Sequence, residues 1–245
     1  MLKIAPDEVH LWLAFPNLIQ EPELLSAYNE LLTKEEHQLY LRKHQKHKHQ
    51  YLVTRALIRS VLSRYINLKP SVWRFSKNKY GRPEVITDEL PLRFNLSHTK
   101  DLIVCAVVLK QDIGVDIENI EHNNTTNQDV AQRFFSIAEA ADLRSNPTRS
   151  FFDYWTLKES YIKARGMGLS IPLHKFTFHI ADHIKISFNS DLSDDSNQWQ
   201  FWLLEPSPLH RMALAICDKA NYRLNMKVTI PLLSEQDFNC PILSH

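Results

Sequence analysis

The sequence is poor in glycine, with four such residues in a chain of 245: Gly81, Gly114, Gly166 and Gly168. A phosphate-binding P-loop and the dinucleotide motif GxGxxG each need several glycines at fixed spacing, and neither can be placed on these positions. Cysteine is also scarce, at Cys105, Cys217 and Cys240. Such scattered thiols form neither a metal-binding pattern nor a disulfide framework. A nucleotide ligand would therefore have to be held by side chains and a metal ion.

The sequence also lacks an excess of either charge, because 29 basic and 28 acidic residues leave a net charge of +1. A nucleic-acid partner held by bulk charge is therefore not expected. No apolar run approaches the ~20 residues of a transmembrane helix, and residues 1–15 contain no basic and then apolar signal region. With 44% hydrophobic residues, the composition is that of a globular protein. We expect it to be cytoplasmic and to bind neither nucleic acid nor membrane.

Helical and strand-like patterns alternate along the chain in an order that occurs twice. Helical spacing over 23–66 is followed by predicted strands at 72–75, 92–96, 102–109 and 113–118. A polar stretch at 122–129 is predicted to be a loop or linker. Helical patterns at 133–143 and 150–165 then precede predicted strands at 176–180, 184–188, 199–204 and 212–217.

This repeat predicts an α+β fold of two similar halves, each with a helix packed on an antiparallel sheet. Cys105 and Cys217 fall on the corresponding late strand of each half. We place the first half at residues 1–120 and the second at 121–225, followed by a tail at 226–245 that shows no recognisable motif. A cleft between two such halves is a common place for a ligand.

Two carboxylates in the segment IGVDIE at 113–118 are candidates for a metal site. Residues two apart in a strand point to the same face, so Asp116 and Glu118 project together while Val115 and Ile117 face the core. Adjacent carboxylates repel each other unless a cation lies between them, and Mg²⁺ is often shared between carboxylates and substrate phosphates. The alternative is a pair of solvated acids at the end of a strand.

A third carboxylate, Glu159, lies in the segment WTLKESYIKARGMG at 155–168. At ~100° per residue, helical geometry places it on one apolar stripe with Trp155 and Ile162. A carboxylate among bulky apolar groups tends to be paired, bound to metal or raised in pKa, and each of these is typical of a functional site. The alternative is an ordinary i,i+4 pair with Lys163, which would stabilise the helix by roughly 0.2–0.5 kcal/mol. The pattern indicates no role for the neighbouring lysine at position 158.

Two further segments could bind phosphate. In FNLSHTKD at 94–101, Ser97 and His98 could donate hydrogen bonds to a phosphate; the alternatives are a turn-forming cluster and a fragment of a hydrolase site. In YGRP at 80–83, a tight turn would hold Arg82 out for bidentate phosphate contact.

The segment RKHQKHKHQ at 42–50 is rich in lysine and histidine. Its histidines suggest a metal site, but on a helix they would point in different directions. A solvated face and phosphate contact are the two other interpretations. Taken together, the three acids with Arg82, His98 and Lys163 describe a site for Mg²⁺ and a multiply phosphorylated ligand.

The order of these motifs resembles that of the surfactin-type 4′-phosphopantetheinyl transferases. The segments that show the resemblance are YGRP, FNLSHT, IGVDIE, RFFS and WTLKESYIKARGMGLSIPL. They cover residues 50–180 densely and the remainder more loosely. The GxDxE strand and the WxxKExxxK helix at this separation are highly specific together.

The resemblance implies a monomer whose halves are related by a pseudo-twofold axis, with coenzyme A in the cleft between them. It implies transfer of the 4′-phosphopantetheine group of coenzyme A to a serine hydroxyl of an apo acyl, peptidyl or aryl carrier protein, with release of adenosine 3′,5′-bisphosphate. The protein would thus be an enzyme of the holo-[acyl-carrier-protein] synthase type.

The resemblance also implies roles for the acids and for one lysine. By position in the motifs, Asp116, Glu118 and Glu159 would hold Mg²⁺, or alternatively Mn²⁺, on the pyrophosphate. Glu159 would also deprotonate the carrier serine, directly or through water. Lys163 would contact the pyrophosphate and balance charge on it and on the leaving group.

In the same way, Ser97, His98 and Arg82 would contact the nucleotide part of coenzyme A, with His98 at its 3′-phosphate. Arg82 stands where lysine is common in the family, which keeps the charge. The segment 42–50 is arginine-rich in many relatives, so its role at the 3′-phosphate falls on a different set of cations here. The candidates are Arg42, Lys46 and Lys48.

Functions of two other classes remain open. A non-catalytic module that binds coenzyme A or a carrier protein would use the same fold, although retention of the three acids and Lys163 argues against it. A metal-dependent phosphohydrolase would cleave coenzyme A without a carrier. The motifs do not distinguish among fatty-acid, polyketide, polyunsaturated-lipid and nonribosomal-peptide carriers.

Overall fold

The computed structural model describes residues 1–87, 89–121 and 125–245. Its first half begins with a strand and three helices: β1 Glu8–Ala14, α1 Pro22–Glu30, α2 Lys34–Arg42 and α3 Gln45–Leu62. A short and a long hairpin follow, formed by β2 Phe75–Lys77, β3 Pro83–Val85, β4 Leu92–Thr99 and β5 Leu102–Leu109. Short 3₁₀ turns lie at Pro16–Leu18 and Pro70–Val72.

The second half has the same order of elements. It begins with β6 Ile113–Asn119, α4 Thr125–Phe134, α5 Ile137–Ser145 and α6 Phe151–Arg165. A short and a long hairpin again follow, formed by β7 Phe176–Ile180, β8 Ile184–Phe188, β9 Trp199–Ser207 and β10 His210–Cys217. The 3₁₀ turns of this half are Gly168–Ser170, Leu173–Lys175 and Ser196–Gln198. Three more strands come after them: β11 Arg223–Ile230, β12 Ser234–Asp237 and β13 Ile242–Ser244.

The sheet pairings confirm the predicted α+β fold of two similar halves. One sheet has the strand order β12-β11-β1-β5-β4 and the other has β13-β9-β10-β6, so the unit β1-β5-β4 corresponds to β6-β10-β9. Strand β6 pairs with β10, whereas a division at residue 120 assigns this strand to the first half. Residues 226–245, expected as a tail, help to complete both sheets, because β11 pairs with β1 and β13 pairs with β9.

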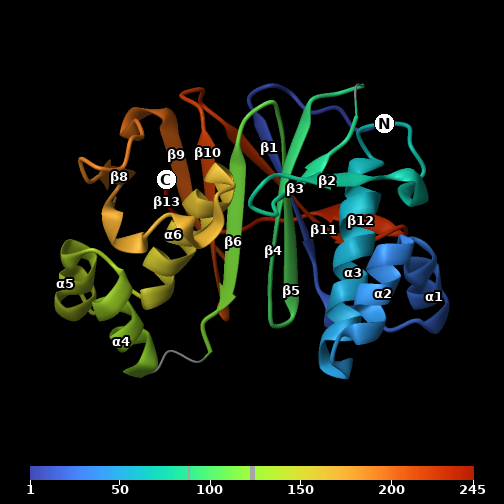
Figure 1. Cartoon of the computed structure of the whole chain (residues 1–245), viewed down its shortest axis with the longest axis horizontal. Coiled ribbons are helices and arrows are strands. Elements are labelled where there is room, and N and C mark those ends of the chain that lie inside the picture. The colour runs from blue at the N-terminus through green and yellow to red at the C-terminus, as the bar shows by residue number, and fades with distance from the viewer. Residues whose placement is uncertain (88, 122–124) are drawn as a thin grey trace.

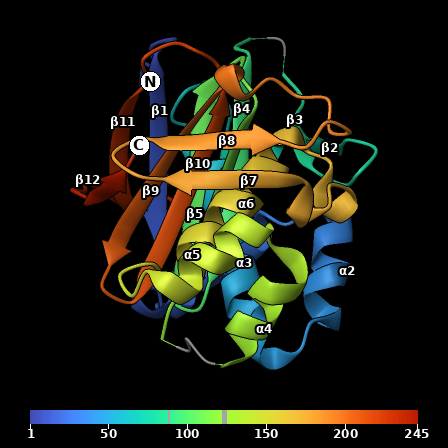
Figure 2. The same ribbon diagram turned by 90° about the vertical axis from the view of Figure 1, so that its left-hand side faces the viewer.

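In the described part of the chain, three hydrophobic cores separate the layers of the molecule. Alternate residues of a strand enter different cores, as the period of two requires: Ile103 and Cys105 of β5 pack with α3, while Val104 and Ala106 face the second sheet. The third core lies between the second sheet and α6. The two sheets therefore lie in the middle, with α1–α3 on one flank and α4–α6 on the other (Figure 1). The β7–β8 hairpin lies beside α6 on the second flank (Figure 2).

Several local predictions differ from the structure. The helical region 23–66 is divided into three helices, because a capping box at Thr33 starts α2 and His44 caps α3. Only Phe75 of the strand predicted at 72–75 lies in β2. Residues 125–129, predicted as part of a loop, begin α4, and residues 122–124 lie outside the described part of the chain. None of the described helices is both long and apolar enough to cross a membrane.

The packing of α6 on β6 depends on Gly114. A Cβ atom at this position would lie 1.9 Å from the carbonyl oxygen of Ser160 and 2.4 Å from the backbone nitrogen of Ala164. Both are backbone atoms of α6, so they could move aside only if the whole helix shifted. The absence of a side chain at Gly114 therefore lets α6 lie directly on β6, next to Asp116 and Glu118.

We expect Gly114→Ala to lower the free energy of unfolding by roughly 3 kcal/mol, because the added methyl group overlaps the helix backbone. Gly168→Ala is the matched control. Gly168 has φ +58°, but no described atom lies within 4 Å of a Cβ added there, so this change should cost about 1 kcal/mol. Urea denaturation measures both, and equal losses in the two variants would contradict the role of Gly114.

Candidate functional site

Strands β4 and β6 form a seam between the two sheets. Among the described residues their backbones share no ladder of hydrogen bonds, and side chains of β4 instead accept from backbone N–H groups of β6. The donor–acceptor pairs are Val115–Asn95 at 3.0 Å, Ile117–Ser97 at 3.4 Å and Asn119–Thr99 at 3.0 Å. The polar residues of FNLSHT therefore lie in a strand and not in a turn, and they join the two halves.

Asp116 lies in the seam and is only 4% exposed. Its Oδ1 accepts hydrogen bonds from Ser97 Oγ at 2.9 Å and from Lys163 Nζ at 2.6 Å. Lys163 Nζ also lies 2.7 Å from Ser97 Oγ. The other carboxylate oxygen, Oδ2, is buried and has no hydrogen-bond partner among the described residues. Since a buried carboxylate oxygen is costly to leave unpaired, Oδ2 is well placed to accept a cation or a donor from a ligand.

Glu118 and Glu159 lie beside Asp116, and the pKa of each carboxyl group is raised. Burial is the main cause for both, and the negative charge of Asp116 adds to it. For Glu118 the pKa rises to about 7, with a further contribution from Glu159. Trp155 Nε1 donates to Glu118 Oε1 at 3.2 Å. The structure thus brings the three acids singled out in the sequence into electrostatic reach of one another.

These three carboxylates suit a hard divalent cation. A cation would relieve their mutual repulsion and would give Oδ2 of Asp116 a partner. No group of three or more acidic, histidine or cysteine side chains in the described part of the chain is already arranged around a metal position. The structure therefore contains suitable donors for the expected metal, but they do not form an assembled cluster.

Helix α6 is buried on most sides, and Trp155, Glu159 and Lys163 are half-buried positions along it. These three residues are four apart, so they share one face of the helix. Glu159 lies one turn from Trp155 on this face, as predicted. The face borders the seam, where Trp155 donates to Glu118, and Trp155 also packs against the third hydrophobic core. Ile162, which helical spacing placed on the same stripe, is fully buried.

The fully buried cation of α6 is Lys158. Its Nζ lies 2.8 Å from Glu139 Oε2 and donates to the carbonyl oxygens of Leu173 and Phe176, each at 2.8 Å. The other carboxylate oxygen of Glu139 accepts from a backbone N–H of β7 at 2.8 Å. This ion pair joins α5, α6 and β7, and so it fixes the rotation of the helix that presents Glu159.

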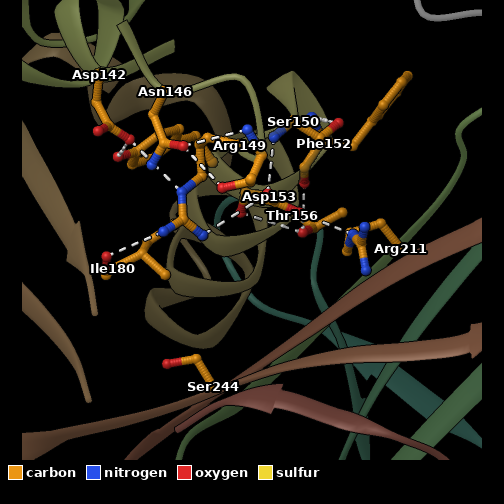
Figure 3. Close-up of polar contacts among 12 residues, drawn as sticks. Asp142, Asn146, Arg149, Ser150, Phe152, Asp153, Thr156, Ile180, Arg211 and Ser244 are labelled. Carbon is orange, nitrogen blue, oxygen red and sulfur yellow. Dashed lines mark hydrogen bonds and ion pairs between the residues drawn. The ribbon is translucent and has the colours of Figure 1, made fainter. Parts of the chain in front are cut away.

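The N-terminal end of α6 is held by a polar network (Figure 3). Ser150 Oγ accepts from the N–H two residues later at 3.2 Å, and Asp153 completes the capping box by accepting from Ser150 N at 2.8 Å. Asp153 also lies 2.8 Å from Arg211 Nε on β10, and Arg149 donates to the carbonyl oxygen of Ile180 on β7 at 3.1 Å. The start of the helix is therefore fixed to the second sheet and to the β7–β8 hairpin.

The YGRP turn predicted that Arg82 would be held out toward a phosphate. In the structure, Arg82 does not project into solvent. Its side chain is 13% exposed, and it donates to the carbonyl oxygen of Ala164 at 2.7 Å, to Glu84 at 3.1 Å and to Asp112 at 3.2 Å. The guanidinium is thus engaged with the end of α6 and with two carboxylates. Its contact with a nucleotide stays a prediction.

His98 is an exposed residue of β4, and cations act on its imidazole. The pKa of its imidazole is lowered, first by desolvation and then by the positive charges of Lys163, Lys43 and Arg55. Lys43 directly follows α2, and Arg55 lies on α3. Neither was among the cations singled out in this region of the sequence, which were Arg42, Lys46 and Lys48.

The sequence patterns did not single out Glu139 or Lys43. They also did not single out Asn95 and Thr99, which flank Ser97 on β4 in the seam. Glu139 has a signal, because Ser136 and Glu139 have the S-x-x-E spacing of a capping box, and this box starts α5. The alternation of Asn, Ser and Thr along FNLSHT likewise indicates one polar face of a strand. Lys43 has no comparable signal, since its electrostatic effect on His98 depends on how α2 and α3 pack.

Known proteins match the chain over both halves. A family model described as the 4′-phosphopantetheinyl transferase superfamily matches residues 112–217, and a model described as 4′-phosphopantetheinyl transferase, N-terminal, matches residues 20–110. The 4′-phosphopantetheinyl transferase Sfp of Bacillus subtilis (strain 168) is 35% identical over 175 residues, which cover 70% of this chain and 75% of Sfp.

Two other relatives agree with this result. The 4′-phosphopantetheinyl transferase HetI of Nostoc sp. (strain PCC 7120) is 34% identical over 69% of this chain and 73% of its own. The 4′-phosphopantetheinyl transferase gsp of Aneurinibacillus migulanus is 34% identical over 68% of this chain and 69% of its own. The point at which the two family models meet lies just before β6, where the sheet pairings also change.

We expect Glu139→Gln to lower the free energy of unfolding by roughly 3–5 kcal/mol, because it leaves the buried charge of Lys158 without a counter-ion. The double variant Glu139→Gln with Lys158→Met removes both charges and should recover much of this loss. Urea denaturation of the single and double variants tests the pair. A single variant within about 1 kcal/mol of the wild type would contradict it.

The raised pKa of Glu118 predicts a pH dependence of stability. Its pKa is about 7 in the folded chain and near 4.5 when unperturbed, so between these values the folded state binds more protons than the unfolded state. The contribution of Glu118 to stability is therefore lost as pH rises through this window. Glu118→Gln should flatten the fall in unfolding free energy, measured by urea denaturation across the window in metal-free buffer. An unchanged slope in this variant would show that Glu118 does not titrate as proposed.

Proposed function

Because the chain belongs to the 4′-phosphopantetheinyl transferase superfamily, we propose that it transfers the 4′-phosphopantetheine group of coenzyme A to a serine hydroxyl of an apo carrier protein. Adenosine 3′,5′-bisphosphate is the leaving product. The observation that supports this reaction best is the convergence of Asp116, Glu118, Glu159 and Lys163 at the seam, with positive charge around His98 beside it. One end of the site thus suits a metal ion and the other suits phosphate.

In this reaction the carrier serine oxygen forms a bond to the phosphorus next to the pantetheine arm. The bond from that phosphorus to the bridging oxygen of the pyrophosphate breaks, and the electron pair stays on the nucleotide phosphate. Glu159 takes the serine proton, directly or through a water molecule. Its half-buried position and raised pKa suit a group that must accept a proton. Lys163 supplies positive charge for the pyrophosphate and the leaving oxygen.

We assign Asp116, Glu118 and Glu159 as the residues that would hold Mg²⁺, or Mn²⁺ in its place. When bound, such an ion neutralises and orients the pyrophosphate. Lys163 occupies Oδ1 of Asp116 and leaves Oδ2 for the ion. Ser97 donates to the same Oδ1, so its position supports a role in orienting Asp116 and Lys163 as well as the expected contact with the nucleotide.

For the nucleotide end of coenzyme A, we assign His98 to the 3′-phosphate, together with Lys43 and Arg55. Positive charges that lower the pKa of an imidazole also attract a phosphate. We propose that the enzyme acts as a monomer, because both sides of the seam come from one chain. The partner is an apo acyl, peptidyl or aryl carrier protein, and the four carrier pathways named above remain alternatives.

The transfer itself is tested by incubating the protein with coenzyme A, Mg²⁺ and a panel of apo carriers. We expect at least one carrier to gain the mass of one phosphopantetheine group, and kcat/KM to rank the carriers. Glu159→Gln and Asp116→Ala should each lower the rate by roughly a thousandfold, because they remove the base and a metal donor. Both variants should keep the wild-type circular dichroism spectrum.

Glu23→Gln, an exposed charge change on α1, is the control and should transfer at the wild-type rate. Mass spectrometry of the carrier follows the reaction. If no carrier on the panel gains mass, the transferase proposal fails. Tight binding of coenzyme A without turnover would instead favour a binding module, and cleavage of coenzyme A without a carrier would favour a phosphohydrolase.

A further inference from the structure

The turn between β2 and β3 is organised by Asn78. Its Oδ1 accepts from the backbone N–H groups of Tyr80 and Arg82, each at 2.9 Å. These two bonds direct the amide nitrogen away from the turn, where Nδ2 donates to the carbonyl oxygen of Gly166 at 2.8 Å. An asparagine of the first half therefore binds the end of α6, which belongs to the second half.

Arg82 makes a second bond to the same helix end, from Nη1 to the carbonyl oxygen of Ala164 at 2.7 Å. Gly166 ends α6 with φ 62°, and a Cβ atom added there would lie 2.8 Å from Arg82 Cζ. The guanidinium thus lies directly against the end of the helix. The last carbonyl groups of a helix lack partners within it and have partial negative charge. Asn78 and Arg82 supply both hydrogen bonds and a positive charge at this end.

Arg82 also contacts the junction between the halves. Its Nη2 lies 3.2 Å from Asp112 Oδ1, and Asp112 directly precedes β6. The same Asp112 oxygen accepts from Arg93 of β4, and the backbone carbonyl of Asp112 accepts from Cys217 N in β10 at 3.0 Å. The guanidinium of Arg82 therefore connects α6 with β4 and with the start of β6, and this connection needs no ligand.

We propose that Asn78 and Arg82 are positioning residues, which clamp the C-terminal end of α6 against the first half. Arg82 would then serve the transfer through this clamp and not by contact with the nucleotide. Ala164 directly follows Lys163, so holding its carbonyl group sets the position of Lys163 against Asp116 and, one turn earlier, that of Glu159. This inference rests on the proposed transferase reaction for its effect on rate.

The clamp is tested by measuring kcat and KM for coenzyme A in Asn78→Ala and Arg82→Lys. Lysine keeps the charge of Arg82 but cannot span its three acceptors, and alanine at position 78 removes no charge at all. We expect kcat to fall roughly tenfold in each variant, the effect of losing about one hydrogen bond. The KM for coenzyme A should stay within about twofold of the wild type, because no ligand contact is lost.

Lys79→Ala is the matched control. Lys79 is an exposed cation in the same turn and lies over the ring of Tyr80, at 4.9 Å from its centroid, so its removal should leave kcat unchanged. The clamp is overturned if Arg82→Lys keeps the wild-type kcat, or if Asn78→Ala does so. A change confined to the KM for coenzyme A in Arg82→Lys would likewise overturn it and would favour a nucleotide contact.

A measurement without substrate separates the clamp from the proposed function. Hydrogen–deuterium exchange of the free protein should be roughly tenfold faster over residues 162–168 in Asn78→Ala and Arg82→Lys, because local opening of the helix end becomes easier. Exchange over residues 151–155 at the other end of α6 should not change. If the wild type transfers to no carrier, the proposed function fails while this experiment still tests the clamp. Unchanged exchange at 162–168 overturns the clamp even in an active enzyme.

Discussion

The close contact between α6 and β6 at Gly114 is the constraint on which the site depends. Because no side chain separates the two backbones there, acids from a strand and an acid from a helix can share one small volume. The helix is then held along its length: by the polar network at Asp153, by the buried pair of Lys158 with Glu139, and by Arg82 at its end. A helix fixed at three places presents its functional groups in one geometry, as positional catalysis requires.

The seam beside this contact has an electrostatic polarity. Lys163 pairs with Asp116, while Glu118 and Glu159 place two further carboxyl groups with raised pKa values beside it. At His98 the charges that lower the pKa of the imidazole are those of Lys163, Lys43 and Arg55, of which Lys163 pairs with Asp116 and Arg55 with Glu36. A ligand that combines a metal ion with several phosphates matches both areas, whereas a purely anionic or purely cationic ligand would match one of them. Because β4 joins the backbone of β6 through its side chains and not through its own backbone, these charged groups can lie between the sheets without breaking a strand pairing.

The sequence predicted which side chains lie near one another at the seam better than it predicted their other connections. Asp116, Glu118 and Glu159 could be found because the periods of strands and helices are local rules, and the order of elements predicted two similar halves. The partner of Lys158 and the buried place of Arg82 depend on residues distant in the chain, and no local pattern encodes them. The place of β6 in the second sheet also depends on a distant pairing, with β10. Helical spacing placed Glu159 on a stripe correctly but could not show which neighbour that stripe faces.

The placement of β11 and β13 has a consequence for how the chain acquires its structure. Glu8 pairs with Arg223 in parallel, so β11 joins the first sheet only after the whole second half has been synthesised. The last strand, β13, then covers the edge of β9. Pairings between such distant segments have a high cost in loop-closure entropy and form late. Although its halves repeat the same elements, neither half has a complete sheet until residues 223–244 are in place, and we therefore expect the molecule to fold as one cooperative unit.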